Sequence, residues 1–227
     1  MFSGETTLLD LFPLYLSLKV AIVATAISFV VGILIAWVLA RLDFLGKSLV
    51  ASLVTLPMVL PPTVMGYYLL VVIGRQGPLG RILEDQFGIS LVFTWQAAVI
   101  ASSLVSIPLM VRAAQAAFEG VDRSFENAAR TLGRSELSIF LTVTIPLAWR
   151  GILAGTALAF ARALGEFGAT LMVAGNIPAQ TQTMPLAIYD AVQSGNTTLA
   201  NLLVGIVTVT AIVVLIILER AGKATKW

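Results

Sequence analysis

Residues 126–146 read E-N-A-A-R-T-L-G-R-S-E-L-S-I-F-L-T-V-T-I-P, a polar, helix-prone stretch between two long apolar runs. Just before it, Asp122 or Ser124 can cap a short helix. Gly133 can end that helix and Ser135 can start another. The stretch therefore predicts a helix, a tight turn and a second helix, exposed at one side of a membrane.

The composition places this loop in a membrane protein. Hydrophobic residues make up 58% of the chain and charged residues 11%, whereas soluble proteins are about 45–50% apolar and about 25% charged. A helix needs about 20 apolar residues to cross the hydrocarbon core. Five runs are long enough: 20–40, 49–73, 91–111, 151–173 and 199–218. The sequence predicts an all-α, polytopic membrane protein with about five transmembrane helices in one domain, 1–227, with a cytoplasmic loop over about 112–150.

The basic residues predict the orientation, because cytoplasmic loops carry the excess of Lys and Arg. Only Arg75 and Arg81 fall on one side of the predicted spans. Ten basic residues fall on the other side: Arg41, Lys47, Arg112, Arg123, Arg130, Arg134, Arg150, Arg220, Lys223 and Lys226. We expect the N-terminus outside and the C-terminus in the cytoplasm, in a plasma membrane of bacterial type.

The chain contains neither cysteine nor histidine. This composition excludes disulfides, thiol chemistry, Cys/His zinc sites and histidine proton relays. The chain has no dense basic patch of the kind that would favour a nucleic-acid partner. We expect no catalytic, cofactor-binding or metal-binding residue in this chain.

The second apolar run contains L-P-M-V-L-P-P-T-V-M-G-Y, with prolines at Pro57, Pro61 and Pro62. Each proline removes a backbone donor, so one straight helix cannot hold all three. Broken membrane helices lie against protein or a water-filled path, where the freed carbonyl groups find partners. The prolines are candidates for a translocation path or gate; the alternative is a kink that only shapes packing.

Two later runs show small or polar residues on one face. In the third run the polar residues favour an interior face; they are Ser102, Ser103 and Ser106. In the fourth run small residues recur every four positions, which permits close helix contact; they are Gly151, Gly155, Ala159 and Ala163. That contact could lie within one subunit or across a dimer.

Arg162 and Glu166 are the charged residues inside the fourth run. Counted from residue 151, Arg162 falls near the middle of the predicted span. A charge at the centre of a lipid-facing helix costs about 2.5–3.5 kcal/mol, so both side chains should face the bundle interior, a partner or water. They could line or gate an anion path, or they could form a neutralised pair that holds two helices together.

The polar loop resembles the coupling loop of ABC importer permeases, which reads Glu-Ala-Ala, three residues, Gly, nine residues and Ile-x-Leu-Pro. Ala128, Ala129, Gly133 and Pro146 match this pattern, while Asn127 stands at the Glu position with Glu126 beside it. We expect the two alanines to leave a bare surface and Glu126 to belong to a charged rim that contacts an ATPase. On shape alone, the loop could instead be an amphipathic helical pair on the headgroups.

Further motifs resemble the molybdate permease subunits of these importers across essentially the whole chain. They are 56–67, E-G-V-D at 119–122, G-E-F-G-A-T at 165–170, N-I-P at 176–178 and T-x-T-x-P at 181–185. The resemblance implies a type I ABC importer permease, a transport subunit that is not itself an enzyme. It also implies a homodimer on a cytoplasmic ATPase dimer, which holds ATP and magnesium, and an external oxyanion-binding protein.

Three alternatives remain at this stage. A sulfate-type oxyanion permease would share the same loop. An ion-coupled carrier would use Arg162 and Glu166 as its own charge relay and would need no coupling loop. A membrane scaffold would explain the loop but would leave the two charges without a role.

Overall fold

The computed structural model describes residues 10–224, and the regular elements within this range are all helical. In chain order the elements are α1 (Phe12–Arg41), α2 (Lys47–Val59), α3 (Pro62–Ile73), α4 (Pro78–Phe87), α5 (Trp95–Glu119), α6 (Arg123–Thr131), α7 (Glu136–Ile139), the π-helical turn η1 (Phe140–Thr144), α8 (Ile145–Leu164), α9 (Gly168–Ala174), α10 (Met184–Gln193) and α11 (Thr197–Ala224). The predicted all-α fold is confirmed.

Four helical stretches are long and apolar enough to cross a membrane: α1, α5, α11 and the continuous stretch α7–η1–α8. Helices α2 and α3 qualify together as a fifth, but they are bent by 113° at their junction. The expectation of about five spans is therefore confirmed, and the second span is broken where the prolines predicted a break.

The predicted bounds of three spans were wrong. Helix α1 begins at Phe12, eight residues before the predicted start at 20. The helix assigned to 151–173 instead runs over Glu136–Leu164, and Gly168–Ala174 forms the separate helix α9. Helix α5 continues to Glu119, eight residues beyond the predicted end at 111. Polar residues near the ends of these helices were read as loop, although helices continue past the apolar boundary when their polar ends reach water. Because α5 and the stretch that begins at Glu136 extend into the predicted cytoplasmic loop, about 112–150, less of that loop is non-helical than expected.

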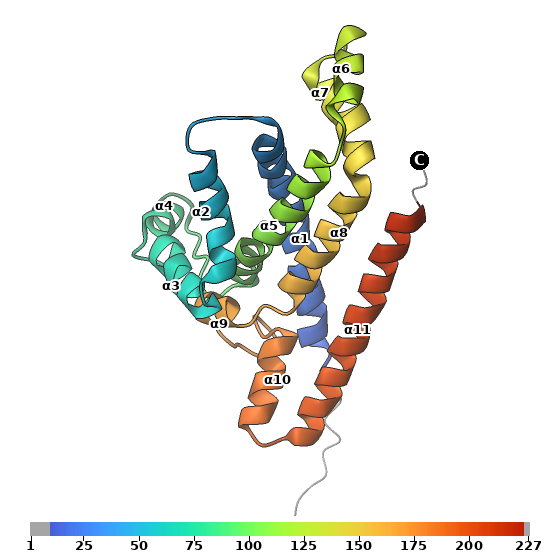
Figure 1. The fold of residues 1–227 in the computed structure, drawn as a ribbon. Coiled ribbons are helices and arrows are strands. Elements are labelled where there is room, and N and C mark those ends of the chain that lie inside the picture. The colour runs from blue at the N-terminus through green and yellow to red at the C-terminus, as the bar shows by residue number, and fades with distance from the viewer. Residues whose placement is uncertain (1–9, 225–227) are drawn as a thin grey trace, which may run out of the picture.

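Helices α1, α5 and α8 pack together at the centre of the bundle (Figure 1). The hydroxyls of Ser28 in α1 and Ser106 in α5 share a hydrogen bond of 2.8 Å, so the predicted interior face of α5 is confirmed. A Cβ atom on Gly155 of α8 would lie 2.8 Å from the Cβ of Ala113 in α5. The small-residue stripe thus serves contact within the subunit, at least at this position.

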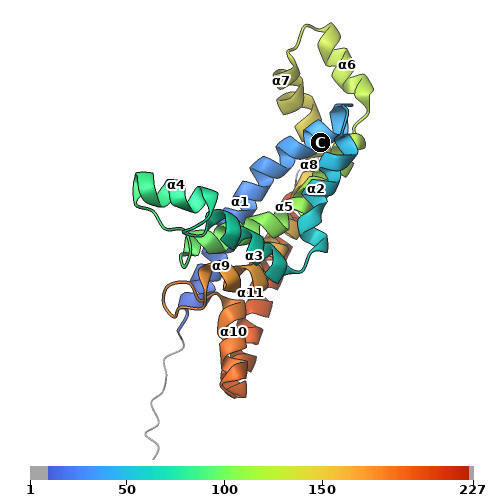
Figure 2. The same ribbon diagram turned by 90° about the vertical axis from the view of Figure 1, so that its left-hand side faces the viewer.

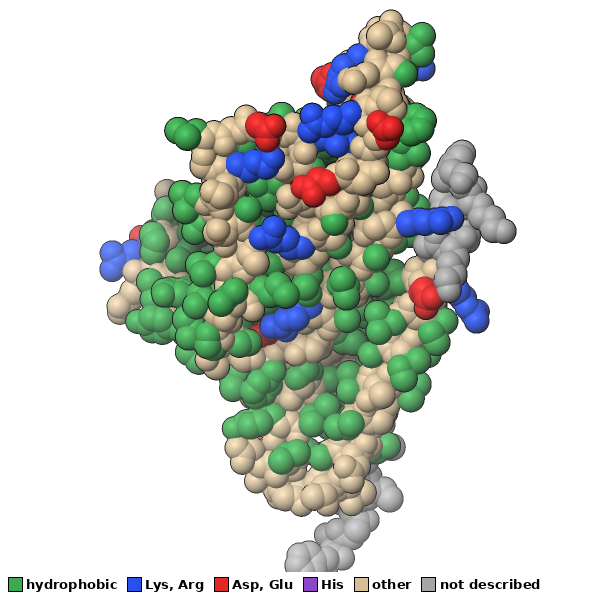
Figure 3. All heavy atoms as spheres, in the orientation of Figure 1, with side chains coloured by type: hydrophobic (Ala, Val, Ile, Leu, Met, Phe, Trp, Pro, Cys, Tyr) green, Lys and Arg blue, Asp and Glu red, His purple; other side chains and the backbone are tan. Residues whose placement is uncertain are grey.

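The bundle has two different ends. The polar segment α6–α7 projects beyond the other helices at one end, where the C-terminal end of α11 also lies (Figures 1 and 2). Helix α10 lies at the opposite end. Apolar side chains cover much of the lateral surface, and charged side chains gather toward the end that bears α6 and α7 (Figure 3). This distribution is typical of a protein embedded in lipid.

Candidate functional site

The segment between α5 and α8 folds into the helix, turn and second helix that its capping residues predict. The carboxylate of Asp122 accepts the backbone N–H of Ser124 at 2.8 Å, and the hydroxyl of Ser135 accepts the N–H of Ser138 at 3.3 Å. The hydrogen bonds from Ser124, its backbone N–H first, hold the pKa of Asp122 below its usual range. The capping carboxylate is therefore charged at neutral pH.

Gly133 forms the turn between α6 and α7. Its φ is +78°, in the left-handed region, and an added Cβ would meet no atom within 4 Å. The N–H of Gly133 donates to the carbonyl of Arg130 at 2.9 Å, and the N–H of Arg134 donates to the carbonyl of Ala129 at 3.2 Å. The backbone conformation, and not the available space, is what favours glycine here.

The outer surface of this loop carries large apolar side chains that the sequence interpretation missed. Phe125, Leu132 and Leu137 are exposed, Leu132 to 82%. Asn127 and Ala128 are exposed beside them, and Ala129 is half-buried. The signal was present in the sequence, since three large apolar residues fall within a short polar loop, and grouped apolar side chains on a surface mark sites of protein or membrane contact.

One ion pair crosses the turn on the exposed side. Arg130 donates to both carboxylate oxygens of Glu136, at 2.6 and 2.9 Å, and its third nitrogen donates to the side-chain oxygen of Asn127 at 2.7 Å. Both partners of the ion pair are substantially exposed. The pair joins α6 to α7 and holds Asn127 in place at the surface.

Glu126 does not belong to the charged rim, so that expectation was wrong. Its residue exposure is only 4%, and one carboxylate oxygen accepts both Nη2 of Arg41 at 2.8 Å and the hydroxyl of Thr144 at 2.7 Å. Arg41 and Thr144 are 85 and 18 residues away in sequence. No pattern in the sequence connects them, because the contact depends on how α1 and η1 pack beside α6.

Pro146 lies within a continuous helical stretch. It is the second residue of α8, after Ile145, which follows η1 directly, and so it sits in the first turn of that helix. Proline has no N–H to donate and its ring crowds the carbonyl of the residue four before it, here Thr142. A widened π-helical turn relieves both problems and lets the helix continue.

A second candidate site lies where two helix breaks meet. Pro57 is inside α2, Pro61 is the residue before α3, and Pro62 is its first residue. The break brings the start of α3 against α9, and a Cβ on Gly168 would lie 3.0 Å from the Cβ of Pro62 and 3.4 Å from the backbone nitrogen of Thr63. This α3–α9 junction joins segments about 100 residues apart in the chain.

The break between α8 and α9 has a local cause. Gly165 ends α8, and the carboxylate of Glu166 accepts the backbone N–H of Ala169 at 2.8 Å. Glycine is a poor helix former, and a side chain that caps a nearby N–H competes with a continuing helix. The hydroxyl of Thr170, the next residue, is buried and has no hydrogen-bond partner among the described residues.

Arg162 and Glu166 form an ion pair of 2.7 Å at this break. The carboxylate side chain is 1% exposed, whereas the guanidinium side chain is 32% exposed. Arg162 lies in the last turn of α8 and not at mid-helix as predicted, because the helix ends at Leu164 and not at residue 173. The pair spans the junction of α8 with α9, so it is not a bridge between two distant helices.

Comparison with known proteins agrees with this arrangement. Residues 28–222 match the family model described as "Binding-protein-dependent transport system inner membrane component". The chain belongs to this family. It is therefore a component of an inner-membrane transport system, and such systems imply an ATPase and a substrate-binding protein as partners.

Particular relatives are similar over most of their length. The chain is 52% identical to the "Molybdenum transport system permease protein ModB" of Escherichia coli (strain K12), over 79% of this chain and 78% of that protein. The Haemophilus influenzae protein of the same name is 47% identical, over 82% and 81%. A "Sulfate transport system permease protein CysW" of Synechococcus elongatus is 35% identical, over 93% and 75%.

The fold is also similar to a solved transporter chain. A chain of the MetNI methionine ABC transporter, in inward-facing conformations, superposes with a TM-score of 0.76 at 17% identity, with both chains fully covered. At that identity the likeness concerns the fold alone. The two chains share the same helical architecture over their full lengths.

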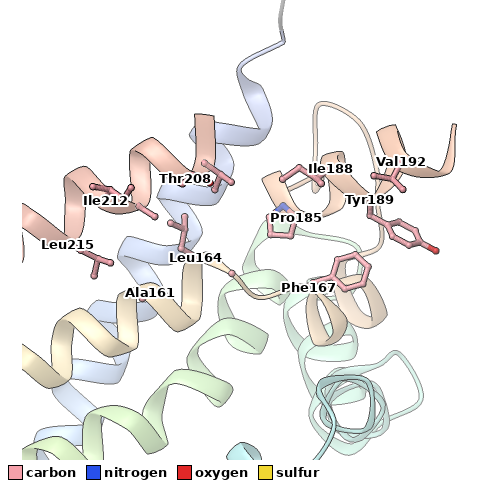
Figure 4. A pocket seen from close by; sticks show the side chains of 13 residues that line it. Ala161, Leu164, Phe167, Pro185, Ile188, Tyr189, Val192, Thr208, Ile212 and Leu215 are labelled. Atoms are coloured by element: carbon pink, nitrogen blue, oxygen red, sulfur yellow. The ribbon is translucent and has the colours of Figure 1, made fainter. Parts of the chain in front are cut away.

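An apolar groove borders the α8–α9 break. It has a volume of about 710 Å³ and lies between α8, α10 and α11 (Figure 4). Phe167 and Tyr189 meet at one wall, with ring centroids 5.2 Å apart, and Thr208 and Ile212 of α11 line the opposite wall. The lining is almost wholly apolar, so the groove suits lipid or protein and not an anion.

Among the described residues, no group of three or more His, Cys, Asp or Glu side chains lies close enough to hold a metal ion. The structure pairs Arg162 with Glu166 at the α8–α9 break, and it places Pro62 against Gly168 at the start of α9.

Proposed function

We propose that this chain is the membrane-spanning subunit of an ATP-driven ABC importer that moves molybdate into the cytoplasm. The observation that carries the proposal is the 52% identity to a molybdenum permease over most of both chains, together with a loop built like a docking element. The chain acts as a transport subunit and performs no bond chemistry. ATP and magnesium belong to the partner ATPase.

The loop is the proposed docking site for that ATPase. Its exposed apolar side chains, Phe125, Leu132 and Leu137, would fill a groove on the partner. Asn127 and Ala128 lie on the same exposed side. Apolar groups inside a polar rim are typical of protein interfaces, and the Arg130–Glu136 pair supplies part of such a rim.

The α3–α9 junction is the proposed translocation path or gate. Broken helices that meet inside a bundle are typical of transporter binding sites, because the freed helix ends direct backbone groups toward the substrate. The N-terminal end of α3 carries a partial positive charge, which suits an oxyanion. Arg162, whose side chain is one-third exposed at the α8–α9 break, adds a positive charge that Glu166 partly offsets.

An energy source is needed for this transport. A dianion that enters against a potential of 100 mV costs about 4.6 kcal/mol, and a thousandfold accumulation adds about 4.1 kcal/mol. We propose alternating access: ATP closes the ATPase pair, the loops of two permeases move together, and the bundles rock around the junction. The external binding protein would deliver the oxyanion.

The permease is proposed to work as a homodimer, with the groove between α8, α10 and α11 facing the second copy. Most of α11 is exposed, and a continuous apolar groove beside it offers a self-complementary surface. Because the chain has no cysteine, single cysteines report contact cleanly. Ile212→Cys, inside the groove, should cross-link two copies, whereas Val213→Cys, equally exposed but outside the groove, should not.

The sulfate reading remains the second candidate because sulfate permeases are also relatives, at 35% identity. Liposomes that contain this chain, its ATPase and the loaded binding protein distinguish the two. We expect molybdate or tungstate to stimulate ATP hydrolysis and uptake more than sulfate. Stimulation by sulfate alone would transfer the assignment, and a folded chain that never assembles with the ATPase would overturn the importer proposal.

A further inference from the structure

Glu126 differs from the other charged residues of the loop because it faces the bundle. It is 4% exposed, and the side chain of its partner Arg41 is 9% exposed. The same oxygen, Oε1, accepts from Nη2 of Arg41 at 2.8 Å and from the hydroxyl of Thr144 at 2.7 Å. These three residues belong to three elements: α6, the last residue of α1, and η1.

Such a buried pair is weak evidence for stability, because desolvation of both charges offsets most of their attraction. An apolar pair of similar size would hold the elements together equally well. Two further interactions hold Arg41 in place. It lies at the C-terminal end of α1, where the helix dipole favours a cation. Its Nη2 also donates to the carbonyl of Val121 at 3.4 Å. The geometry is therefore specific and directional.

Aromatic rings that line the same cavity as the ion pair join η1 to α1, and they extend the contact to α5. Phe140 of η1 meets Trp37 of α1, with ring centroids 5.6 Å apart, and Phe118 of α5 at 6.1 Å. Ile139, next to Phe140, is 2% exposed. Thr144 and Phe140 both belong to η1, so the hydrogen bond from Thr144 connects α6 to an element that is also packed against α1 and α5.

We infer that Glu126, Arg41 and Thr144 form a buried latch that transmits the movement of the loop to α1 and α8. The inference rests on the proposed function and assigns Glu126 an internal role as a positioning residue, not a contact with the ATPase. The exposed neighbours, Asn127 and Ala128, remain available to the partner. Thr144 is the last residue of η1, so its hydrogen bond to Glu126 acts directly at the start of α8.

The test measures the number of ATP molecules hydrolysed per molybdate imported, in liposomes with the ATPase and the loaded binding protein. Thr144→Val removes the hydroxyl and keeps the shape, whereas Thr144→Ser keeps the hydroxyl. We expect Thr144→Val and Glu126→Gln to raise the ATP-to-molybdate ratio about tenfold, the order of typical coupling free energies. Both complexes should still copurify with the ATPase, and Thr144→Ser should resemble the wild type.

Asp43→Asn is the matched control. Asp43 pairs with Lys47 at 3.0 Å at the same end of the bundle, but the carboxylate is 89% exposed and both residues lie between α1 and the first turn of α2. Loss of this exposed pair should leave the ratio unchanged, because surface ion pairs contribute about 0–1 kcal/mol.

Different results overturn different statements. If Glu126→Gln releases the ATPase from the complex, the residue is a partner contact and the latch is wrong. If Glu126→Gln and Thr144→Val both assemble and keep the wild-type ratio of ATP to molybdate, the latch is also wrong. If Glu126→Gln does not accumulate in the membrane, the ratio measured for Thr144→Val alone tests the latch. Absence of import by the wild type would instead contradict the proposed function.

Discussion

Among the residues that the structure describes, two Arg–Glu ion pairs have a buried carboxylate, and they differ in what they connect. Arg41 and Glu126 are 85 residues apart, and both are nearly inaccessible. Arg162 and Glu166 are four residues apart, and one of them is one-third exposed. The distant pair joins three helical elements at the loop, whereas the local pair shapes a single helix break. In this permease, one buried carboxylate connects separate helical elements, and the other stabilises a break between two consecutive helices.

The largest effect is expected at the loop turn. Gly133→Glu places a charge on the surface proposed for the ATPase and forces a left-handed backbone on a residue with a Cβ, at a cost of about 1–2 kcal/mol. Uptake should fall to background while the amount of permease in the membrane stays the same. Gly133→Asn, which accepts the left-handed conformation more readily, should retain part of the activity. Unchanged uptake in Gly133→Glu would contradict the coupling role.

The local ion pair should matter more for transport than for assembly. Glu166→Gln leaves Arg162 unpaired but still one-third exposed, so we expect uptake to fall about tenfold, equivalent to ~1.4 kcal/mol in a barrier. The amount of complex with the ATPase should change far less. The double variant Arg162→Gln with Glu166→Gln should restore stability without restoring uptake; recovery of both would identify the pair as purely structural.

One added methyl group should disturb the close contact between α3 and α9. In Gly168→Ala the added Cβ would lie 3.0 Å from the Cβ of Pro62, and overpacking of this kind costs about 1–3 kcal/mol. We expect a lower thermal midpoint and a partial loss of uptake. Gly205→Ala in α11 is the control, since nothing lies within 4 Å of the added atom, and it should stabilise the helix by up to about 1 kcal/mol. Equal midpoints for the two variants would exclude tight packing at the junction.

The smallest effect concerns the cap of α6. Asp122→Ala removes the acceptor for the N–H of Ser124, so hydrogen-exchange protection of residues 123–131 should fall while global stability is nearly unchanged. Because the folded state lowers the pKa of Asp122, the cap is fully effective above the unfolded pKa and is lost as the pH falls through the folded pKa. Protection in the wild type should therefore decline on acidification, and Asp122→Ala should lack this component.

Much of this permease could be predicted from local patterns. Apolar length predicted the spans, prolines predicted the break between α2 and α3, and the serines of α5 predicted an interior face. Capping residues predicted the helix, turn and helix of the loop. Each of these features depends on backbone chemistry or on side-chain periodicity within one segment, and both are visible in sequence.

The predictions were wrong where polar residues lie near a helix end. Such a residue can either continue the helix or end it, and its side chain can be either exposed or buried. The fourth span was misplaced because Gly165 and Glu166 looked like continuing helix, and only the capping bond to Ala169 ends it there. Glu126 looked like a surface charge, since its amphipathic helix is otherwise polar and exposed. Its partners come from α1 and η1, and no local rule identifies them.

Composition, backbone conformation and short motifs were enough to predict the membrane class, the broken second span, the loop turn at Gly133 and the resemblance to importer permeases. The burial of Glu126 with Arg41 and Thr144, and the contact between the start of α3 and α9, became visible in the folded molecule. These features depend on desolvation and close packing, and both depend on which distant segments the whole fold makes neighbours.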